Sequence, residues 1–386
     1  MSAATRVLIV DPSGELYGSE QVLLDLLAHL DRGRIDVTVG CPPSTPLWDA
    51  LASRGEQCVA VYTPRGEGAG GLLRSVWSLR RAVIQVRPDI VHLNQAGPFK
   101  HVALALRGQG TPLLVHIRLA EDAAHVQARA ARWLAPDGLI AISHYIRHLL
   151  PADARATTLY DPFDASAWRA SVQPVQLRAN LGLSADTPVV LFVGRICATK
   201  GVDVLVEAAG RLSSEVHVAI VGAPPVGPEN AAYAAGLHAQ ATQLGVADRL
   251  HWLGRRSDVA GLVTEASVLA VPSRTEPLGR VLFEALSVGT PVVASSVGGM
   301  VEVVGADERG WAVPPDDAQA LAATVTDALA RPLEAARRTA AGAKWVATRC
   351  EPAAHARAVE QLYQLDWTPA ASRASPHRWR DRSPSL

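Results

Sequence analysis

The chain has 386 residues, and its 37 lysines and arginines balance 37 aspartates and glutamates, so the overall charge gives no reason to expect a nucleic-acid partner. With 48% apolar residues, it is long enough for two domains with substantial cores. Widely spaced cysteines indicate neither a zinc knuckle nor a disulfide framework: Cys41, Cys58, Cys197 and Cys350. The first apolar run, residues 6–10, is too short for a signal peptide or a membrane span, and we expect a cytoplasmic protein.

The first half alternates short apolar runs with helical patterns or loops that contain glycine and proline. The runs predict strands at residues 6–11, 36–40, 58–62, 90–94, 113–117 and 139–143. Residues 19–30 have Val and Leu at helical spacing, with Ser19 as the expected N-cap. This alternation is typical of a parallel sheet with helices on both faces.

Residues 161–173 lack periodicity, and the same alternation restarts after them. Strands are predicted at residues 189–193, 217–221, 250–253, 268–272, 291–294 and 311–314, and helical patterns at 318–329 and 333–365. We therefore predict an α/β protein with two Rossmann-like domains, 1–165 and 166–345, a helix 346–366 that crosses back to the first, and a disordered tail, 367–386. Ligands of such sheets bind beyond the carboxyl ends of the strands.

One strand-end segment, residues 268–296, combines an expected helix N-terminus with two carboxylates. Pro277, Leu278 and Gly279 are expected to open a helix to about residue 288, and such an N-terminus suits an anion like a diphosphate. Glu276 precedes this helix and Glu284 lies eight residues on, a rise of roughly 12 Å that could separate a sugar ring from a nucleoside ribose. The two glutamates alone are equally well explained as a helix cap and a solvated side chain.

Other strand-end loops carry candidate ligand groups. Arg195 and Lys200 lie where cations could neutralise phosphate oxygens, although a solvated pair explains them as well. The order of glycine and lysine in residues 194–201 is not that of a Walker A loop. Gly18, in the first loop, allows a ligand to approach the backbone closely. His116 ends a predicted strand, where a lone histidine is more often structural than catalytic.

Several site classes are not indicated by the sequence. It contains no Gly-x-Ser-x-Gly elbow, no His-Glu-x-x-His, no paired Cys-x-x-Cys and no Gly-x-Gly-x-x-Gly opening either half. Asp-x-Asp does not occur, so a carboxylate pair for a catalytic divalent metal is not evident. We therefore expect neither a metal site nor a cofactor.

Together, these motifs resemble the GT4 family of retaining glycosyltransferases, which belong to glycosyltransferase group 1 and have the GT-B fold. Glu276 to Glu284 is similar to that family's E-x7-E motif, and residues 194–201 to its diphosphate-binding Arg/Lys pair. Further segments match in the family's order: residues 17–24, 115–116, 141–147, 253–255, 297–302 and 310–314. The chain departs from the family pattern at Tyr17, Leu278 and Ile117–Arg118, and the last departure bears on acceptor recognition.

The resemblance implies a reaction and its site residues. The donor is a nucleotide-diphosphate sugar, and the acceptor is an unidentified sugar, lipid-linked or small-molecule hydroxyl, as in polysaccharide or glycolipid biosynthesis. Glu276 contacts the sugar hydroxyls, Glu284 contacts the ribose, and His116 orients sugar or acceptor. The donor's diphosphate is held without a metal, and the remaining donor-binding residues are Gly18, Arg195, Lys200, Leu278, Gly279 and Arg280. The family retains anomeric configuration, by front-face attack, so no protein nucleophile is assigned.

Two alternative functions stay open at this point. A GT-B sugar-nucleotide epimerase would release free nucleotide and epimerised sugar without any acceptor. A non-enzymatic nucleotide-sugar-binding subunit of a glycan assembly complex is disfavoured by the intact set of Arg195, Lys200, Glu276 and Glu284.

Residues 72–87 form a basic amphipathic run. One helical face carries Leu72, Leu73, Val76, Leu79 and Val83, with arginines nearby. Such a helix usually packs its apolar face on the core and leaves the basic side in solvent. The alternative is peripheral contact with the inner face of a membrane.

Overall fold

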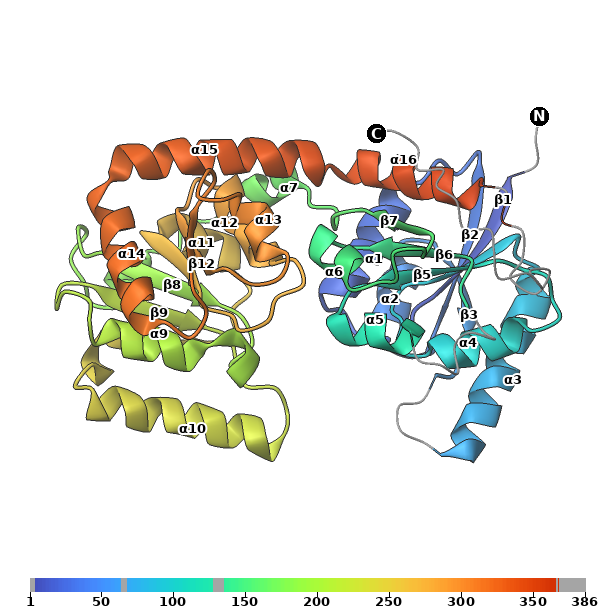
Figure 1. Cartoon of the computed structure of the whole chain (residues 1–386), viewed down its shortest axis with the longest axis horizontal. Helices are drawn as coiled ribbons and strands as arrows, with labels where there is room; N and C mark the ends of the chain where they lie inside the picture. Colours follow the sequence, from blue (N-terminus) through green and yellow to red (C-terminus); the bar gives the residue numbers. More distant parts are fainter. Residues whose placement is uncertain (1–3, 64–67, 128–134, 366, 368–386) are drawn as a thin grey trace. The chain divides into compact units, whose positions relative to one another are not determined.

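The computed structural model describes residues 4–63, 68–127, 135–365 and 367 (Figure 1). It divides into two compact units, Met1–Pro162 with Pro352–Leu386, and Phe163–Glu351. We expected boundaries at 165/166 and 345/346, whereas the chain crosses after Pro162 and after Glu351. The N–H of Phe163 donates to the carbonyl of Cys350 at 2.7 Å, which ties the two crossing points together within the second unit.

Among the described residues, the first unit contains a seven-stranded sheet in the order β3-β2-β1-β4-β5-β6-β7, and each recorded pairing is parallel. The strands are β1 (Thr5–Val10), β2 (Ile35–Cys41), β3 (Gln57–Ala60), β4 (Ile90–Leu93), β5 (Leu113–Ile117), β6 (Gly138–Ala141) and β7 (Ala156–Thr158). The helices are α1 (Gly18–His29), α2 (Pro46–Ser53), α3 (Ala69–Val86), α4 (Phe99–Leu106), α5 (Ala120–Gln127) and α6 (His144–His148). Strand β7 was not predicted, because its three residues form no apolar run.

The second unit contains a six-stranded parallel sheet in the order β10-β9-β8-β11-β12-β13. Its strands are β8 (Val189–Val193), β9 (His217–Val221), β10 (Leu250–Gly254), β11 (Val268–Val271), β12 (Val292–Ser295) and β13 (Trp311–Val313). Its helices are α7 (Ala165–Ala170), α8 (Leu177–Asn180), α9 (Val202–Ala209), α10 (Pro228–Gln243), α11 (Val259–Glu265), α12 (Arg280–Ser287), α13 (Met300–Val304), α14 (Ala318–Ala330) and α15 (Pro332–Arg349), with short 3-10 turns η2 (Ala198–Lys200) and η3 (Ala247–Arg249). The central strands are buried on both faces, as expected for a sheet covered by helices.

The helical pattern over residues 333–365 is two helices, α15 and α16 (Pro352–Tyr363), rather than one. Pro352 has no N–H to donate and disfavours helical backbone at the preceding residue, so α15 ends just before it. Helix α15 packs on α12 in the second unit, whereas α16 packs on α1 in the first.

Trp367 was expected in a disordered tail, and that prediction is wrong for this residue. Its side chain is buried, the guanidinium carbon of Arg155 lies 4.1 Å from the ring centroid, and its Nε1–H donates to the Leu362 carbonyl at 2.8 Å. A Cβ at Gly138 would lie 2.3 Å from the ring, so the tryptophan fills the space that this glycine leaves. The rest of the predicted tail, residues 368–386, lies outside the described residues.

Each sheet reverses its strand order at one point, between β1 and β4 in the first unit and between β8 and β11 in the second. At such a point the two following connections run in opposite directions, and ligands bind beyond the carboxyl ends of the two strands. Arg195 and Lys200 follow β8, and Glu276 follows β11. The fold therefore places these residues where a ligand is expected.

Candidate active site

Lys200 and Glu276 meet at the switch point of the second unit, although 76 positions separate them in the chain. The Lys200 ammonium forms an ion pair with the Glu276 carboxylate. Both side chains are largely buried, at 20% and 13% exposed. The structure thus brings one cation suited to phosphate and one carboxylate suited to sugar hydroxyls into direct contact.

Close backbone contacts hold the loop after β8 in place. Gly201 has a φ of +64°, and a Cβ there would lie 2.0 Å from the carbonyl oxygen of Pro272. Gly222, after β9, has a φ of +139°, and its Cβ would lie 1.8 Å from the carbonyl oxygen of Gly194. Only glycine fits these two positions, so the loop that carries Lys200 is packed tightly between its neighbours.

Arg274 joins the loop after β11 to the loop after β8. Its guanidinium donates two hydrogen bonds to the Asp203 carboxylate, at 2.8 and 2.6 Å, and one to the carbonyl of Ala198 at 2.6 Å. Its Nε donates to Asp316 at 2.6 Å. Burial raises the pKa of Asp203, but the hydrogen bonds from Arg274 and Tyr233 outweigh it, and the pKa is lowered overall. These hydrogen bonds therefore fix the loop after β11 and position Glu276, which lies two residues after Arg274.

Helix α12 begins at Arg280, so the prediction that Pro277 opens it was wrong. Gly279 is the N-cap with a φ of +89°, which is not helical, and its Cβ would lie 2.9 Å from the side chain of Met300. The N–H of Gly299 donates to the Glu276 carbonyl at 3.1 Å, so the loop after β12 also supports this segment. Glu276 consequently lies on a loop that is braced from both sides, and not on the helix.

The other predicted donor-binding residues of this unit differ in exposure. Arg195 is exposed, and its guanidinium forms no ion pair with a described residue. Leu278 is buried at 2% exposed, which leaves its backbone rather than its side chain for a ligand. Arg280 is partly buried at the first position of α12.

Glu284 lies in the second turn of α12 and is partly buried. Burial raises the pKa of its carboxyl to about 7, and the charge of Arg280 opposes this shift. Its backbone carbonyl accepts a hydrogen bond from the Trp168 indole at 3.0 Å, which anchors α7 to the helix. A carboxyl with this pKa changes charge near neutral pH, so its ability to accept hydrogen bonds from ribose hydroxyls depends on pH.

The corresponding edge of the first sheet carries a buried polar network. Asn94, after β4, donates to the Asp11 carboxylate after β1 at 2.7 Å. Glu20 is buried, accepts from the N–H of Tyr17 at 2.9 Å and from the Gln95 amide at 2.5 Å, and so links α1 to the loop after β4. Tyr17, not Ser19, is the N-cap of α1. Gly18 is exposed at the first position of this helix.

His116 lies in β5 and is only 2% exposed. Its Nδ1 is 3.3 Å from a guanidinium nitrogen of Arg118, which can only donate, so Nδ1 accepts and Nε2 carries the proton. Burial, and then the charge of Arg118, lowers the pKa of His116 well below its usual range. Nε2 has no hydrogen-bond partner among the described residues. His116 is thus a neutral imidazole, and its Nε2–H is a donor without a partner among the described residues.

Arg118, in one of the segments that depart from the family pattern, is a buried internal cation. It pairs with Asp161 at 2.7 Å and donates to the carbonyl and the side chain of Asn94 at 3.0 and 2.9 Å. The Arg118 and Asp161 side chains are only 8% and 7% exposed. Its charge is therefore used inside the unit to fix His116 and Asn94, and it is not offered to a ligand.

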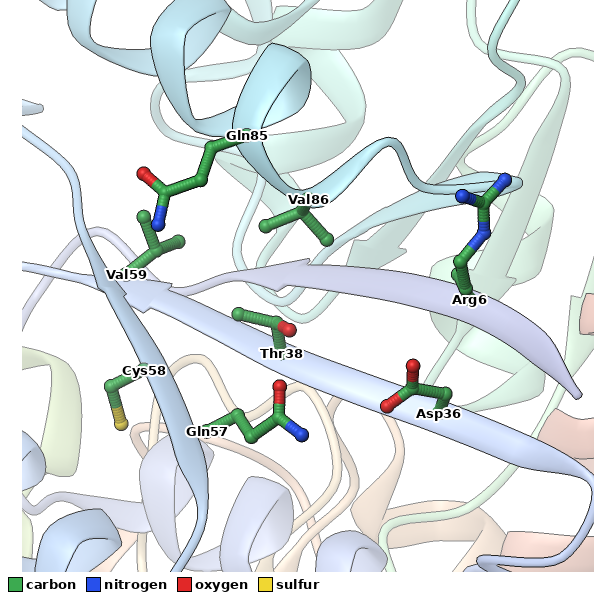
Figure 2. Close-up of a pocket in the computed structure, with 8 residues that line it drawn as sticks. All are labelled: Arg6, Asp36, Thr38, Gln57, Cys58, Val59, Gln85 and Val86. Carbon is green, nitrogen blue, oxygen red and sulfur yellow. The ribbon is translucent and has the colours of Figure 1, made fainter.

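A separate hollow of about 240 Å³ lies elsewhere in the first unit (Figure 2). Its lining comes from the start of β1, the first part of β2, most of β3 and the end of α3: Arg6, Asp36, Thr38, Gln57, Cys58, Val59, Gln85 and Val86. The hollow is therefore away from the carboxyl edge that carries Asp11 and His116. Arg6 already pairs with Asp89 at 2.8 Å, and nothing in the lining matches the predicted chemistry.

Within the described residues, His, Cys, Asp and Glu side chains do not gather in any group of three or more that could hold a metal ion. Over the same residues, no helix combines the length and the apolar character needed to cross a membrane.

Two family models cover most of the chain. Residues 17–164 match the Glycosyltransferase Family 4 model, and residues 176–345 match the model described as Glycosyl transferases group 1. Each half of the chain therefore matches a model of a glycosyltransferase family. The first matched segment contains β2 to β7 and the second contains β8 to β13. The second segment also contains Arg195, Lys200, Glu276 and Glu284.

Curated relatives of this chain include two proteins named D-inositol 3-phosphate glycosyltransferase. The Xylanimonas cellulosilytica protein is 37% identical over 204 residues, which is 52% of this chain and 47% of the relative. The Mycobacteroides abscessus protein is 38% identical over 212 residues, 53% of this chain and 47% of the relative. The chain thus spans about half the length of the curated relatives it matches.

Solved structures share the fold of this chain. Anabaena HepE in complex with UDP superposes with a TM-score of 0.79 at 23% identity, over 94% of this chain and all of the other. Sucrose-phosphate synthase from Thermosynechococcus elongatus superposes with a TM-score of 0.74 at 23% identity, over 93% and 98%. The prediction of a GT-B fold with two parallel-sheet α/β domains is confirmed.

Three supporting residues were not found from the sequence: Glu20, Asp203 and Arg274. Their partners lie far along the chain, since Arg274 bonds residues 71 and 42 positions away, and Glu20 bonds one 75 positions away. No spacing rule signals contacts of this kind. The sequence offered one indication: Glu20 lies within the family-like segment 17–24, and Arg274 lies within the segment 268–296.

Proposed function

We propose that this chain transfers a sugar from a nucleotide-diphosphate sugar to an acceptor hydroxyl. The observation that carries the proposal is the contact of Lys200 with Glu276, on the loops that follow the neighbouring strands β8 and β11. Arg195 lies on the same loop as Lys200 and is exposed. Two cations and a carboxylate at one switch point suit a ligand that contains both a diphosphate and sugar hydroxyls.

The cations would stabilise the leaving diphosphate. Negative charge grows on the diphosphate as the bond from sugar C1 to the phosphate oxygen breaks, and Arg195, Lys200 and the backbone N–H groups at the start of α12 would bind it. Because cationic side chains can supply this stabilisation, we propose that transfer does not require a metal. Activity should then persist in EDTA; loss of activity in EDTA with recovery in magnesium would overturn this part.

The proposed stereochemical course is retention. The acceptor oxygen forms its bond to C1 on the face that the diphosphate leaves, and the acceptor proton passes to the departing phosphate oxygen, so no covalent enzyme intermediate is needed. Glu276 would bind sugar hydroxyls on the donor. His116 would donate from Nε2 as a neutral hydrogen-bond donor, and its lowered pKa argues against a role as a general base at pH 7.

Comparison suggests where to begin with substrates. HepE has been solved with UDP and with UDP-glucose, which supports UDP-sugars as first donors. The curated relatives are named for D-inositol 3-phosphate, which supports that compound as a first acceptor. All four cysteines are free thiols, in keeping with the proposed cytoplasmic location.

The test is a screen of UDP-, GDP- and ADP-sugars, each with and without acceptor, in which nucleotide release and glycosylated product are both measured. We expect a glycosylated product in equal amount to the released nucleotide, with α-linkage from an α-linked donor. Nucleotide release with an epimerised free sugar and no product would identify an epimerase instead. Binding of a nucleotide sugar without turnover would favour a non-catalytic subunit.

A further inference from the structure

Helix α3 presents a second apolar stripe that does not face the core. Leu79 and Val83, on the face expected to be apolar, are buried, but the prediction that Leu73 shares this face was wrong. Leu73, Trp77 and Ile84 are instead 71%, 64% and 58% exposed. Spacings of four and seven residues place these three side chains on one side of the helix. The helix is therefore apolar on two opposite sides, and only one of them is covered by the described part of the unit.

The surface around this stripe is strongly basic. Neither α3 nor α4, which packs against it, contains an aspartate or a glutamate (Figure 1). The exposed cations of the two helices and of the residues that follow them are Arg74, Arg80, Arg81, Arg87, Lys100 and Arg107. None of the six forms an ion pair with a described residue, and the one acid between the helices, Asp89, pairs with Arg6. This concentration contrasts with a chain whose charges balance overall.

We propose that α3 docks on an anionic membrane surface, with the stripe of Leu73, Trp77 and Ile84 inserted at the interface and the arginines contacting lipid headgroups. Over eleven residues the stripe extends roughly 16 Å along the helix, so the helix would lie in the plane of the surface. Tryptophan with flanking arginine is suited to the boundary between headgroups and acyl chains, and the Arg81 guanidinium lies 5.7 Å from the Trp77 ring centroid.

A membrane explains these observations better than an acidic protein partner does. The three side chains of the stripe do not line the hollow described above, to which α3 contributes Gln85 and Val86 instead. The stripe's apolar side chains are flanked by cations along its whole length, which matches a surface that is apolar below and anionic above. Docking is independent of glycosyl transfer, since none of these residues belongs to the candidate active site.

The experiment is flotation of the full-length protein with vesicles of phosphatidylcholine alone or mixed with phosphatidylglycerol. The wild type should float with the mixed vesicles, and less as salt is raised. Leu73→Ser/Trp77→Ser/Ile84→Ser should lower the partition coefficient by at least about tenfold. Arg74→Gln and Arg81→Gln should each lower it about fivefold, the loss of one basic contact near the surface.

Arg331→Gln/Leu333→Ser is the matched control, because it removes an exposed arginine and an exposed leucine from the second unit. It should float like the wild type, and all variants should keep the wild-type melting temperature. The proposal is overturned if the wild type stays in the soluble fraction at low salt, or if the stripe variant floats like the control. Equal binding to polyglutamate beads and to mixed vesicles, unchanged in the stripe variant, would indicate an acidic protein partner instead.

Discussion

At the scale of single residues, the two glutamates of the E-x7-E segment have different surroundings. Replacing each one should therefore change a different kinetic constant. Glu276 pairs with Lys200 on a braced loop, whereas Glu284 is a partly buried helix residue with a pKa of about 7. In the proposed reaction Glu276 contacts the sugar, whose charge and geometry change during transfer. Glu284 contacts the ribose, which is bound equally in the ground and transition states.

Glu276→Gln should therefore chiefly lower kcat, and it should not weaken UDP binding, because it frees Lys200 from its competing carboxylate. Glu284→Gln should chiefly raise KM for the donor. The pH dependence adds a second readout. Only the ionised Glu284 carboxylate accepts hydrogen bonds from both ribose hydroxyls, so donor KM should rise as pH falls below about 7, by up to about tenfold per unit.

Steady-state kinetics and UDP calorimetry on both variants, from acid to neutral pH, check this prediction. The pH dependence of KM should flatten in Glu284→Gln and persist in Glu276→Gln, which serves as its control because donor phosphate ionisation affects both alike. If both variants lose only donor affinity, or if both keep wild-type kinetics, the assignment of this segment is wrong.

Arg118 should matter chiefly for stability. Its replacement by Met would leave the Asp161 carboxylate buried without a partner, and breaking a buried pair in this way costs about 3–5 kcal/mol. Arg118→Met/Asp161→Asn removes both charges and should recover part of this loss. Chemical denaturation measures both. A single variant as stable as the wild type would show that the pair is not needed inside the unit.

At the scale of elements, the site depends on how firmly the loop after β11 is held to the loop after β8. Arg274, on the loop after β11, supplies four side-chain hydrogen bonds: one to Ala198 in the loop after β8, two to Asp203 in α9, which follows that loop, and one to Asp316 after β13. Lys has a single ammonium group and cannot reproduce this planar set of donors. Arg274→Lys should therefore misplace Glu276 and Lys200 without unfolding the protein.

We expect kcat/KM to fall about tenfold or more in Arg274→Lys, since small misplacements of reacting groups have effects of this order. Arg256→Lys is the matched control, because the Arg256 guanidinium, on the loop after β10, has the nearby Asp258 as its one ion-pair partner in the described part of the chain. The melting temperatures of the two variants should be similar. Equal kcat/KM values for the two variants would mean that Arg274 does not position the site.

At the scale of the whole molecule, most of the sheet architecture could be predicted from apolar runs alone. β5, β8 and β9 have the predicted bounds, because each is a continuous buried run between polar or turn residues. Short elements were missed, since β7 and α7 have too few residues to show a period. The α15/α16 break was missed although Pro352 marks it, because the apolar pattern continues across it.

Site residues that lie within one sequence motif could be predicted. Contacts between residues that are distant in the chain and brought together by the fold could not. Glu276, Glu284 and the Arg195/Lys200 loop stand out in sequence. That Lys200 contacts Glu276 follows only from the strand order, which places β8 beside β11. The burial of Arg118 likewise depends on Asp161, 43 positions away, so its internal role could not be inferred from its neighbours in the chain.

The most direct test of the central claim is the rate of sugar transfer by Lys200→Ala with the UDP-sugar that the wild type uses best. Arg211→Ala, on a surface ion pair with Glu207, is the control. The account predicts that Lys200→Ala lowers kcat by about 10²–10³-fold, the effect of losing one preorganised group that stabilises developing charge, with the fold and the control rate unchanged. A wild-type rate in Lys200→Ala would contradict the claim that the β8 and β11 loops form the donor site.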